Sequence, residues 1–307
     1  MGKHHHHSHS NDSTKAGLSL AFWMNAVFSV IELIGGILTN STAIIADAFH
    51  DFMDAVAIGI ALILEKVSGR KRSKKYSYGY KRFSLLSAVG MSVFLLAGAV
   101  LMIIKAVQSL IHPEVVNSVG MLGLAVLGIA VNGFAFLRIR NAGKESHHAH
   151  SHTQNHNSRA IMLHLLEDIL GWIAVLIGSV IIYFTSWFWI DAVLAIGIAV
   201  FISYNAINNL LNTMKIFLQS VPGSIHVDNL SAELRSIEGI HDFHDLHIWT
   251  LDGNYHVASL HVIINPVYKG REEVIYDSII QLMDKYHIQH PTIQMETTAS
   301  NCRFMSC

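Results

Sequence analysis

Hydrophobic residues in this chain are gathered into six long blocks, which are separated by short polar or charged stretches. An α-helix needs about 20 consecutive, mainly apolar residues to cross the hydrocarbon core of a bilayer. Each block approaches or exceeds that length, so the pattern predicts six membrane-spanning helices. The expected spans are about 17–38, 42–64, 83–109, 118–138, 160–184 and 187–208.

The pattern changes after Lys215, where prolines and charged residues become as frequent as they are in soluble proteins. Two helical patterns and three shorter runs typical of strands follow one another there. Their order, αββαβ, predicts a small soluble α+β domain. The expected elements are helix 226–237, strands 244–251 and 255–264, helix 271–286 and strand 292–296.

Composition supports lipid as the solvent for the first part of the chain. Hydrophobic residues make up 51% of the 307 residues and charged residues 14%, whereas about 25% are charged in an average soluble domain. The formal net charge of −1 argues against binding to nucleic acid. Lys and Arg collect in connections 65–82 and 138–159 and are absent from 39–41, 110–117 and 185–186. Because positive loops stay in the cytoplasm, both basic connections and both termini are expected there.

Two of the predicted spans carry ionisable residues where lipid is expected. His50 and Asp54 lie in the second span, and His164 and Asp168 in the fifth. Each carboxylate in mid-membrane costs about 2.5–3.5 kcal/mol on insertion scales, which marks such residues as functional. A spacing of four places each pair on one helix face. Together they offer the two imidazoles and two carboxylates that a tetrahedral Zn²⁺ accepts.

These residues also have a structural interpretation. A single buried His–Asp pair is more often a hydrogen bond between packed helices, but two matching pairs favour a metal site. Mg²⁺ and Ca²⁺ prefer six or more oxygen ligands, whereas a mixed set suits Zn²⁺, Cd²⁺, Co²⁺ or Ni²⁺. Asp47 and Asp51 share the helical arc of His50, and they are expected to orient its ring or guide ions. Glu32 either lines the same cavity or forms an interhelical hydrogen bond.

Histidine-rich segments lie outside the predicted spans. The loop 139–158 is expected to collect zinc weakly, and the alternative is a plain disordered linker. The run His4–His7 fits either a native tail of this kind or a purification tag. The expected organisation is a His-rich tail (1–15), a six-span transmembrane domain (16–215) and a cytoplasmic domain (216–307). The candidate weak ligands of the loop are His147, His148, His150, His152 and His156.

Five motifs in a fixed order resemble the cation diffusion facilitator family of zinc transporters. No motif is decisive alone, but the ordered combination is specific, and the resemblance extends from about residue 16 to residue 298. The motifs are Glu32-Leu-Ile-Gly-Gly36, Ala46–Asp54, Tyr78-Gly-Tyr-Lys-Arg82, His164-Leu-Leu-Glu-Asp168 and His241–Trp249.

The resemblance has implications for mechanism and for regulation. It implies a transport site at the four ligands already found, a homodimer, alternating access, and metal export driven by proton entry. It implies a ferredoxin-like cytoplasmic domain with a regulatory metal site that includes His244 and His261, and His247 is expected on the same strand face. Gln294 and Glu296 occupy positions in the last strand where some relatives have His and Asp.

The expected function is zinc efflux by an integral membrane protein of a bacterial inner membrane. Zn²⁺ is the substrate and a candidate regulatory ligand, Cd²⁺, Co²⁺ and Ni²⁺ are further candidate substrates, and no cofactor or enzymatic activity is expected. Two alternatives use the same intramembrane site. One is a membrane-anchored metal sensor. The other is a metallohydrolase, which needs an open coordination position for water.

Overall fold

The computed structural model describes residues 9–68, 70, 72–145 and 152–297 of the chain. Within these ranges the description excludes some side chains of helical residues, namely those at 9–21, 24, 61–62, 65–66, 68, 139–145 and 152–164. The described chain forms two compact units. The first runs up to Ile63 and continues over Met91–Asn208, and the second contains Leu64–Gly90 and the chain from Asn209.

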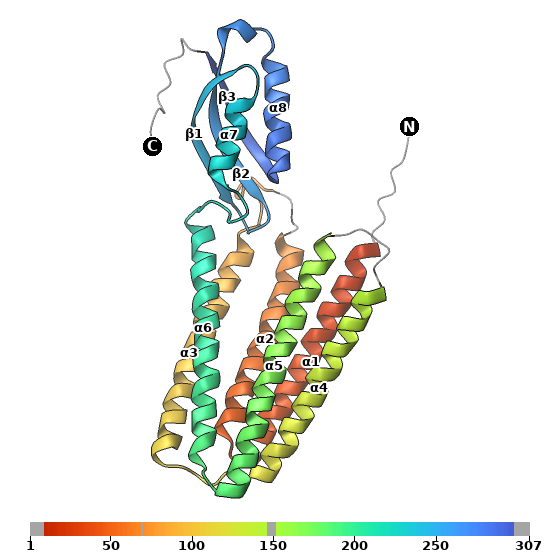
Figure 1. Ribbon diagram of the computed structural model, residues 1–307, viewed down its shortest axis with the longest axis vertical. Coiled ribbons are helices and arrows are strands. Elements are labelled where there is room, and N and C mark those ends of the chain that lie inside the picture. The colour runs from red at the N-terminus through yellow and green to blue at the C-terminus, as the bar shows by residue number, and fades with distance from the viewer. Residues whose placement is uncertain (1–8, 69, 71, 146–151, 298–307) are drawn as a thin grey trace. The chain divides into compact units, whose positions relative to one another are not determined.

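Six long helices come first, in the order that the hydrophobic blocks predict (Figure 1). The helices extend beyond the apolar blocks, because their backbone hydrogen bonds continue into the polar residues on either side. Four described segments are long and apolar enough to cross a membrane: Phe83–Ile111, Ser118–Arg138, Leu165–Thr185 and Trp189–Phe217. The helices are α1 (His9–Thr39), α2 (Thr42–Ser68), α3 (Phe83–Ile111), α4 (Ser118–Glu145), α5 (His152–Thr185) and α6 (Trp189–Phe217).

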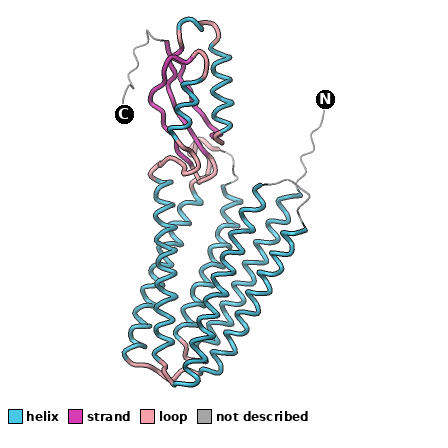
Figure 2. The backbone as a smooth tube through the Cα atoms, viewed as in Figure 1, coloured by secondary structure: helices cyan, strands magenta, loops and turns pink. Residues whose placement is uncertain are grey.

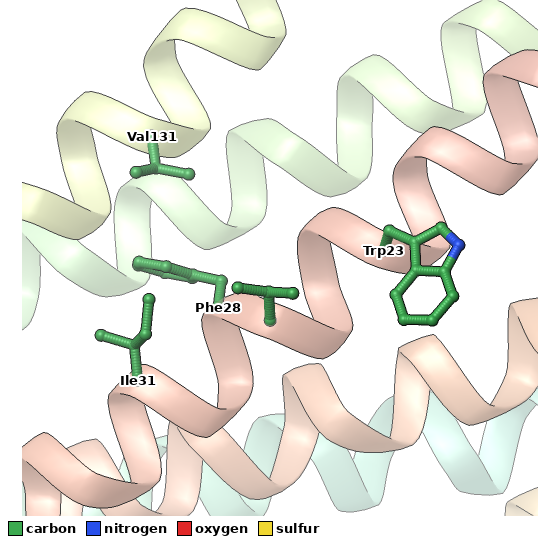
Figure 3. Close-up of a pocket in the computed structure, with 5 residues that line it drawn as sticks. Trp23, Phe28, Ile31 and Val131 are labelled. Atoms are coloured by element: carbon green, nitrogen blue, oxygen red, sulfur yellow. The ribbon is translucent and has the colours of Figure 1, made fainter.

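A buried apolar core of the first unit lies where α1, α4 and α5 meet. Trp172 of α5 is fully buried and its ring meets Phe28 of α1 edge-on, with centroids 6.0 Å apart. A Cβ on Gly128 of α4 would overlap the Trp172 ring, so glycine permits this close helix approach. Beside this core, an apolar pocket is lined by α1 residues, Phe28 among them, and by Val131 of α4 (Figure 3). Because α1 residues Trp23 and Ile31 at its rim are exposed, this surface suits contact with lipid.

The second unit holds a three-stranded mixed sheet with helices and strands in the expected αββαβ order (Figure 2). The central strand β2 pairs antiparallel with β1 and parallel with β3. Alternate β2 residues from Ala258 to Ile264 are buried in one core with apolar residues of both helices, so the helices cover one face. The elements are α7 (Val227–Ser236), β1 (Ile240–Thr250), β2 (His256–Ile264), the 3₁₀ turn η1 (Pro266–Tyr268), α8 (Glu272–Lys285) and β3 (Ile288–Thr297).

The basic connection between α2 and α3 belongs to this second unit. Lys81 Nζ lies 3.9 Å from Asp252 Oδ2 and 4.3 Å from the centre of the Tyr255 ring. Tyr78 meets the ring of His290 edge-on at 5.7 Å. The connection therefore contacts the turn between β1 and β2 and the start of β3.

Candidate metal centres

His50 and Asp54 lie one turn apart on α2, as their spacing predicts. His50 Nε2 is 3.7 Å from Asp54 Oδ2, and the two side chains are 17% and 20% exposed. A tetrahedral ion with bonds of about 2.1 Å holds its ligand atoms about 3.4 Å apart. The observed separation is therefore close to that of two ligands on one metal ion.

The neighbouring residue Phe49 packs between α2 and α3. Its ring stacks on Phe94 with centroids 6.3 Å apart, and a Cβ on Gly98 would overlap it. Because Phe49 directly precedes His50, the close approach of α3 restricts how α2 rotates about its axis. Packing of this kind positions ligand side chains before a metal arrives.

Carboxylates from three helices gather beside the His50 pair. Asp47 is buried and interacts electrostatically with His50, Asp54 and Asp168. Glu32 of α1 is fully buried and interacts with Asp47, Asp51 and Asp168. Asp168 itself is half-buried on α5. Residues that are far apart in the sequence thus form one acidic site, and such a cluster requires cations or protons to balance it.

His164 is only partly described. Its backbone lies in α5, one turn before Asp168 on the same helix face, whereas its side chain is outside the described residues. Glu32, left open by sequence reasoning, faces the acidic site. The sequence signal was its position as a lone carboxylate within an apolar block.

A second candidate centre lies in the sheet of the second unit. His244, His261 and Glu296 offer ligand atoms that all lie within 4.8 Å of one another. His244 Nε2 is 3.1 Å from Glu296 Oε2, and His261 Nδ1 is 2.8 Å from Glu296 Oε1. Gln294 Nε2 donates to Glu296 Oε1 at 2.8 Å and orients the carboxylate. Two imidazoles and one carboxylate form a set that suits Zn²⁺ and related ions.

The strand register explains this grouping. His244 of β1 lies opposite His261 of β2, and His261 lies opposite Gln294 of β3. Glu296 is two residues further along β3 and so shares the face of Gln294. The three side chains therefore meet on one face, although they come from three different strands.

His247 lies on the same strand face as His244, as expected, because their partners His261 and Ser259 are two residues apart on β2, but it is not one of the three residues whose ligand atoms lie within 4.8 Å of one another. The β1–β2 register shifts between His244 and His247, and Asp245 adopts the left-handed region with φ 54°. The irregularity directs His247 toward Asp245, whose Oδ1 is 2.9 Å from His247 Nε2. Asp245 Oδ2 lies 3.9 Å from His261 Nε2. A spacing of three would place the two histidines on opposite faces of a regular strand, and the extra residue of this bulge returns His247 to the face of His244.

The five predicted zinc ligands of the loop lie wholly or partly outside the described residues. Of the loop histidines, His147, His148 and His150 lie outside the described residues. His152 and His156 lie in α5, but their side chains are outside the description. The weak zinc-collecting role of this loop stays a prediction.

Two family models match the chain. The first, described as the cation efflux transmembrane domain, matches residues 18–218. The second, described as the cation efflux protein cytoplasmic domain, matches residues 217–298. Together they cover both units, and their junction falls at the end of α6.

Curated relatives align over almost the whole chain. The "Cadmium, cobalt and zinc/H(+)-K(+) antiporter" of Bacillus velezensis is 32% identical, over 97% of this chain and 93% of that protein. "Metal cation efflux system protein CzcD" of Cupriavidus metallidurans is 31% identical, over 96% and 90%. "Zinc transporter ZitB" of Escherichia coli is 31% identical, over 95% and 92%.

One solved structure also matches part of the chain. It is described as the "Metal-bound C-terminal domain of the CzcD transporter" from C. metallidurans, and it is 32% identical. The match covers 24% of this chain and 99% of that one, with a TM-score of 0.22.

Proposed function

This chain belongs to the cation diffusion facilitator family of cation efflux proteins, and on that premise we propose that it exports Zn²⁺ from the cytoplasm in exchange for protons. It is an integral membrane transporter, not an enzyme, with a transmembrane helical domain followed by a cytoplasmic domain. The transport site of this proposal consists of His50, Asp54, His164 and Asp168.

One observation carries the site assignment. His50 and Asp54 present a nitrogen and an oxygen 3.7 Å apart on an intramembrane helix face, and Asp168 of α5 interacts with the same acidic cluster. This separation matches two ligands of one tetrahedral ion. Asp47 and Asp51 stand beside the ligands, where they attract cations and favour the metal-bound state.

The membrane arrangement follows from charge and helix number. Six spans place both termini and both basic connections on the cytoplasmic side, in a bacterial inner membrane. The cytoplasmic domain adopts a ferredoxin-like arrangement and pairs with that of a second copy. The family model of a dimerising cytoplasmic domain, "ZT_dimer", supports the homodimer.

Proton exchange follows from the ligand chemistry. Zinc binds neutral imidazole, so protons and zinc compete for His50 and His164. When the site opens to an acidic exterior, protons displace zinc, and the reverse holds when it opens to the cytoplasm. The name of the B. velezensis relative, which includes H⁺ and K⁺, supports an antiport mechanism. The same name and the mixed ligand set make Cd²⁺ and Co²⁺ further substrates, and ligand chemistry adds Ni²⁺.

The His244, His261 and Glu296 cluster is the regulatory site of this proposal. Zinc bound there crosslinks three strands and stabilises the domain when cytoplasmic zinc is high. The ion pairs that join the three residues without metal are the alternative. The substitution Glu296→Gln distinguishes a metal site from ion pairs without metal.

The direct experiment is zinc uptake by the purified protein in vesicles that contain a zinc-sensitive dye. We expect protein-dependent zinc entry that protein-free vesicles lack. Failure of a correctly inserted protein to move zinc would reject the transport function, and retention of zinc-dependent structural change alone would favour a sensor. The relatives, which are named as transporters, do not support the sensor or the hydrolase.

A further inference from the structure

Asp191 at the start of α6 binds the first residues of α2. Its side chain is buried, with 1% of its surface exposed. Asp191 Oδ2 accepts the Thr42 N–H at 2.6 Å, and Oδ1 accepts the Ser41 hydroxyl at 2.5 Å and the Ala43 N–H at 3.4 Å. The first amides of a helix lack partners within the helix, and a carboxylate there is favoured by the helix dipole. A residue from α6 therefore caps the helix that carries His50.

The turn before α2 makes a second set of connections at the same end. Asn40 has φ 55°, and its Nδ2 donates to Glu114 Oε2 at 2.9 Å and to the Val115 carbonyl at 3.2 Å. The Asn117 N–H donates to the Thr39 carbonyl at 2.9 Å. These bonds attach the α1–α2 turn to the connection between α3 and α4.

Small residues close the same region. Ala43 of α2, Ala106 of α3 and Ala195 of α6 are fully buried and form one packed cluster. Small side chains allow helices to approach closely in a membrane. The end of the membrane domain opposite the basic α2–α3 connection is thus closed by packing and by the buried bonds of Asp191.

We propose that Asp191 is a positioning residue for zinc transport, which holds this end of the membrane domain closed while the metal site is open to the cytoplasm. The inference rests on the proposed function. His50 is eight residues beyond Thr42, a rise of about 12 Å along α2. Zinc can leave toward this end only after α2 and α6 separate here, which breaks the bonds of Asp191 and admits water to its carboxylate.

Weakening these bonds has a predictable effect on the conformational equilibrium. It stabilises the state open at this end relative to the state open to the cytoplasm. Because cytoplasmic zinc binds only the second state, the apparent affinity is proportional to the fraction of the protein that remains in that state. A residue needed only for folding would lower the amount of active protein and leave the apparent affinity unchanged.

The test uses a full-length chain in which Cys302 and Cys307 are replaced by Ser and Ala195→Cys supplies one reporter thiol. Zinc uptake and labelling by a membrane-impermeant maleimide, applied from the side of this end, are measured on the same vesicles. The variants are Asp191→Ala, Asp191→Asn and Ser41→Ala. Ser179→Ala is the control, because it removes a buried hydroxyl whose hydrogen bond within the described residues goes to the Leu176 carbonyl of α5.

We expect Asp191→Ala to raise the labelling rate at least about fivefold, and to raise the zinc concentration for half-maximal uptake by the factor by which the cytoplasm-open fraction of the protein falls. Asp191→Asn keeps an acceptor oxygen and Ser41→Ala keeps the carboxylate, so both should shift the two readouts in the same direction by less. Ser179→Ala should change neither. If Asp191→Ala fails to insert, the two milder variants carry the test.

Unchanged labelling and half-maximal concentration in inserted Asp191→Asn and Ser41→Ala would overturn the proposal, even if the maximal rate fell. Absence of zinc uptake by the parent chain would instead reject the proposed function. Labelling does not require transport, so the two failures are distinguishable.

Discussion

His50 Nε2 and Asp54 Oδ2 lie 3.7 Å apart on one face of α2, within a helix that the sequence places in the membrane. This distance is longer than a good hydrogen bond and close to the separation of two ligands on one tetrahedral ion. The separation of the pair therefore agrees with the proposed transport site, in which both residues bind one ion. Asp168 of α5, coupled electrostatically to Asp47 beside this pair, provides the connection to the second helix.

Loss of any one ligand should abolish zinc transport. His50→Ala, Asp54→Asn, His164→Ala and Asp168→Asn each leave three ligands in a site built for four, so the ion is held weakly and in the wrong geometry. Initial rates of zinc uptake, normalised to inserted protein, should fall at least about a hundredfold. His226→Ala, which changes an exposed histidine, is the matched control. Wild-type rates in inserted His164→Ala would remove that residue from the site.

Selectivity should follow the ligand atoms. His50→Asp replaces a nitrogen by an oxygen and adds negative charge, and Mn²⁺ prefers oxygen ligands. The ratio of Mn²⁺ to Zn²⁺ uptake should therefore increase in this variant. Exclusive zinc transport at an undiminished rate would mean that selectivity is set elsewhere.

Much of the membrane domain could be predicted because a helix that crosses a bilayer needs a long run of apolar residues. Apolar blocks of sufficient length predicted the helices. A spacing of four residues predicted that His50 and Asp54 share a helix face. Asp191 was not singled out, because its partners are backbone amides of Thr42 and Ala43, which no side-chain pattern marks. Contacts of this kind depend on how distant helix ends meet.

In the C-terminal domain, too, the elements could be predicted from the sequence pattern, whereas a local irregularity of the backbone could not. The order of helices and strands followed from periodicity, and His244 and His261 met as expected. His247 reaches the same face only because the strand is irregular at Asp245, whose left-handed conformation accompanies a shift of the β1–β2 register. A single bulge reverses which residues share a face, and nothing in the local hydrophobic pattern identifies its position.

Glu296→Gln should weaken zinc binding to the cytoplasmic site. The change keeps the side-chain shape but removes the negative charge that faces both His244 and His261. In a full-length chain whose transport site is disabled by Asp54→Asn, zinc affinity measured by calorimetry should fall about tenfold or more. Glu273→Gln, on the exposed first turn of α8, should leave it unchanged. Equal affinities in the two variants would favour ion pairs without metal.

His256 should make the C-terminal domain less stable in mild acid. Burial lowers the pKa of His256 below its ordinary 6.5, His287 lowers it further, and Asp252 opposes the shift. The unfolded chain therefore binds more protons between the lowered pKa and pH 6.5, so stability is lost as pH falls through that window. The protection factors for hydrogen exchange in the β1–β2 region, which are corrected for the intrinsic exchange rate at each pH and measured with chelator present, should fall as pH falls from 7 to 5.5.

His256→Leu tests this assignment. Leucine has no titrating group, and His256 Nδ1 makes no hydrogen bond within the described structure, so the buried site should tolerate the change. The acid-induced loss of protection should become smaller in this variant, whereas His226→Ala should retain it. An identical pH dependence in His256→Leu would assign the effect to other histidines.

Zinc accumulation against its own gradient tests proton-coupled export most directly. Vesicles with an acidic interior are presented with equal zinc on both sides, and the protein is oriented with its cytoplasmic domain outside. The account predicts that zinc accumulates inside, that a proton ionophore stops accumulation, and that His50→Ala shows none. Accumulation that persists without a proton gradient would contradict the exchange of zinc for protons.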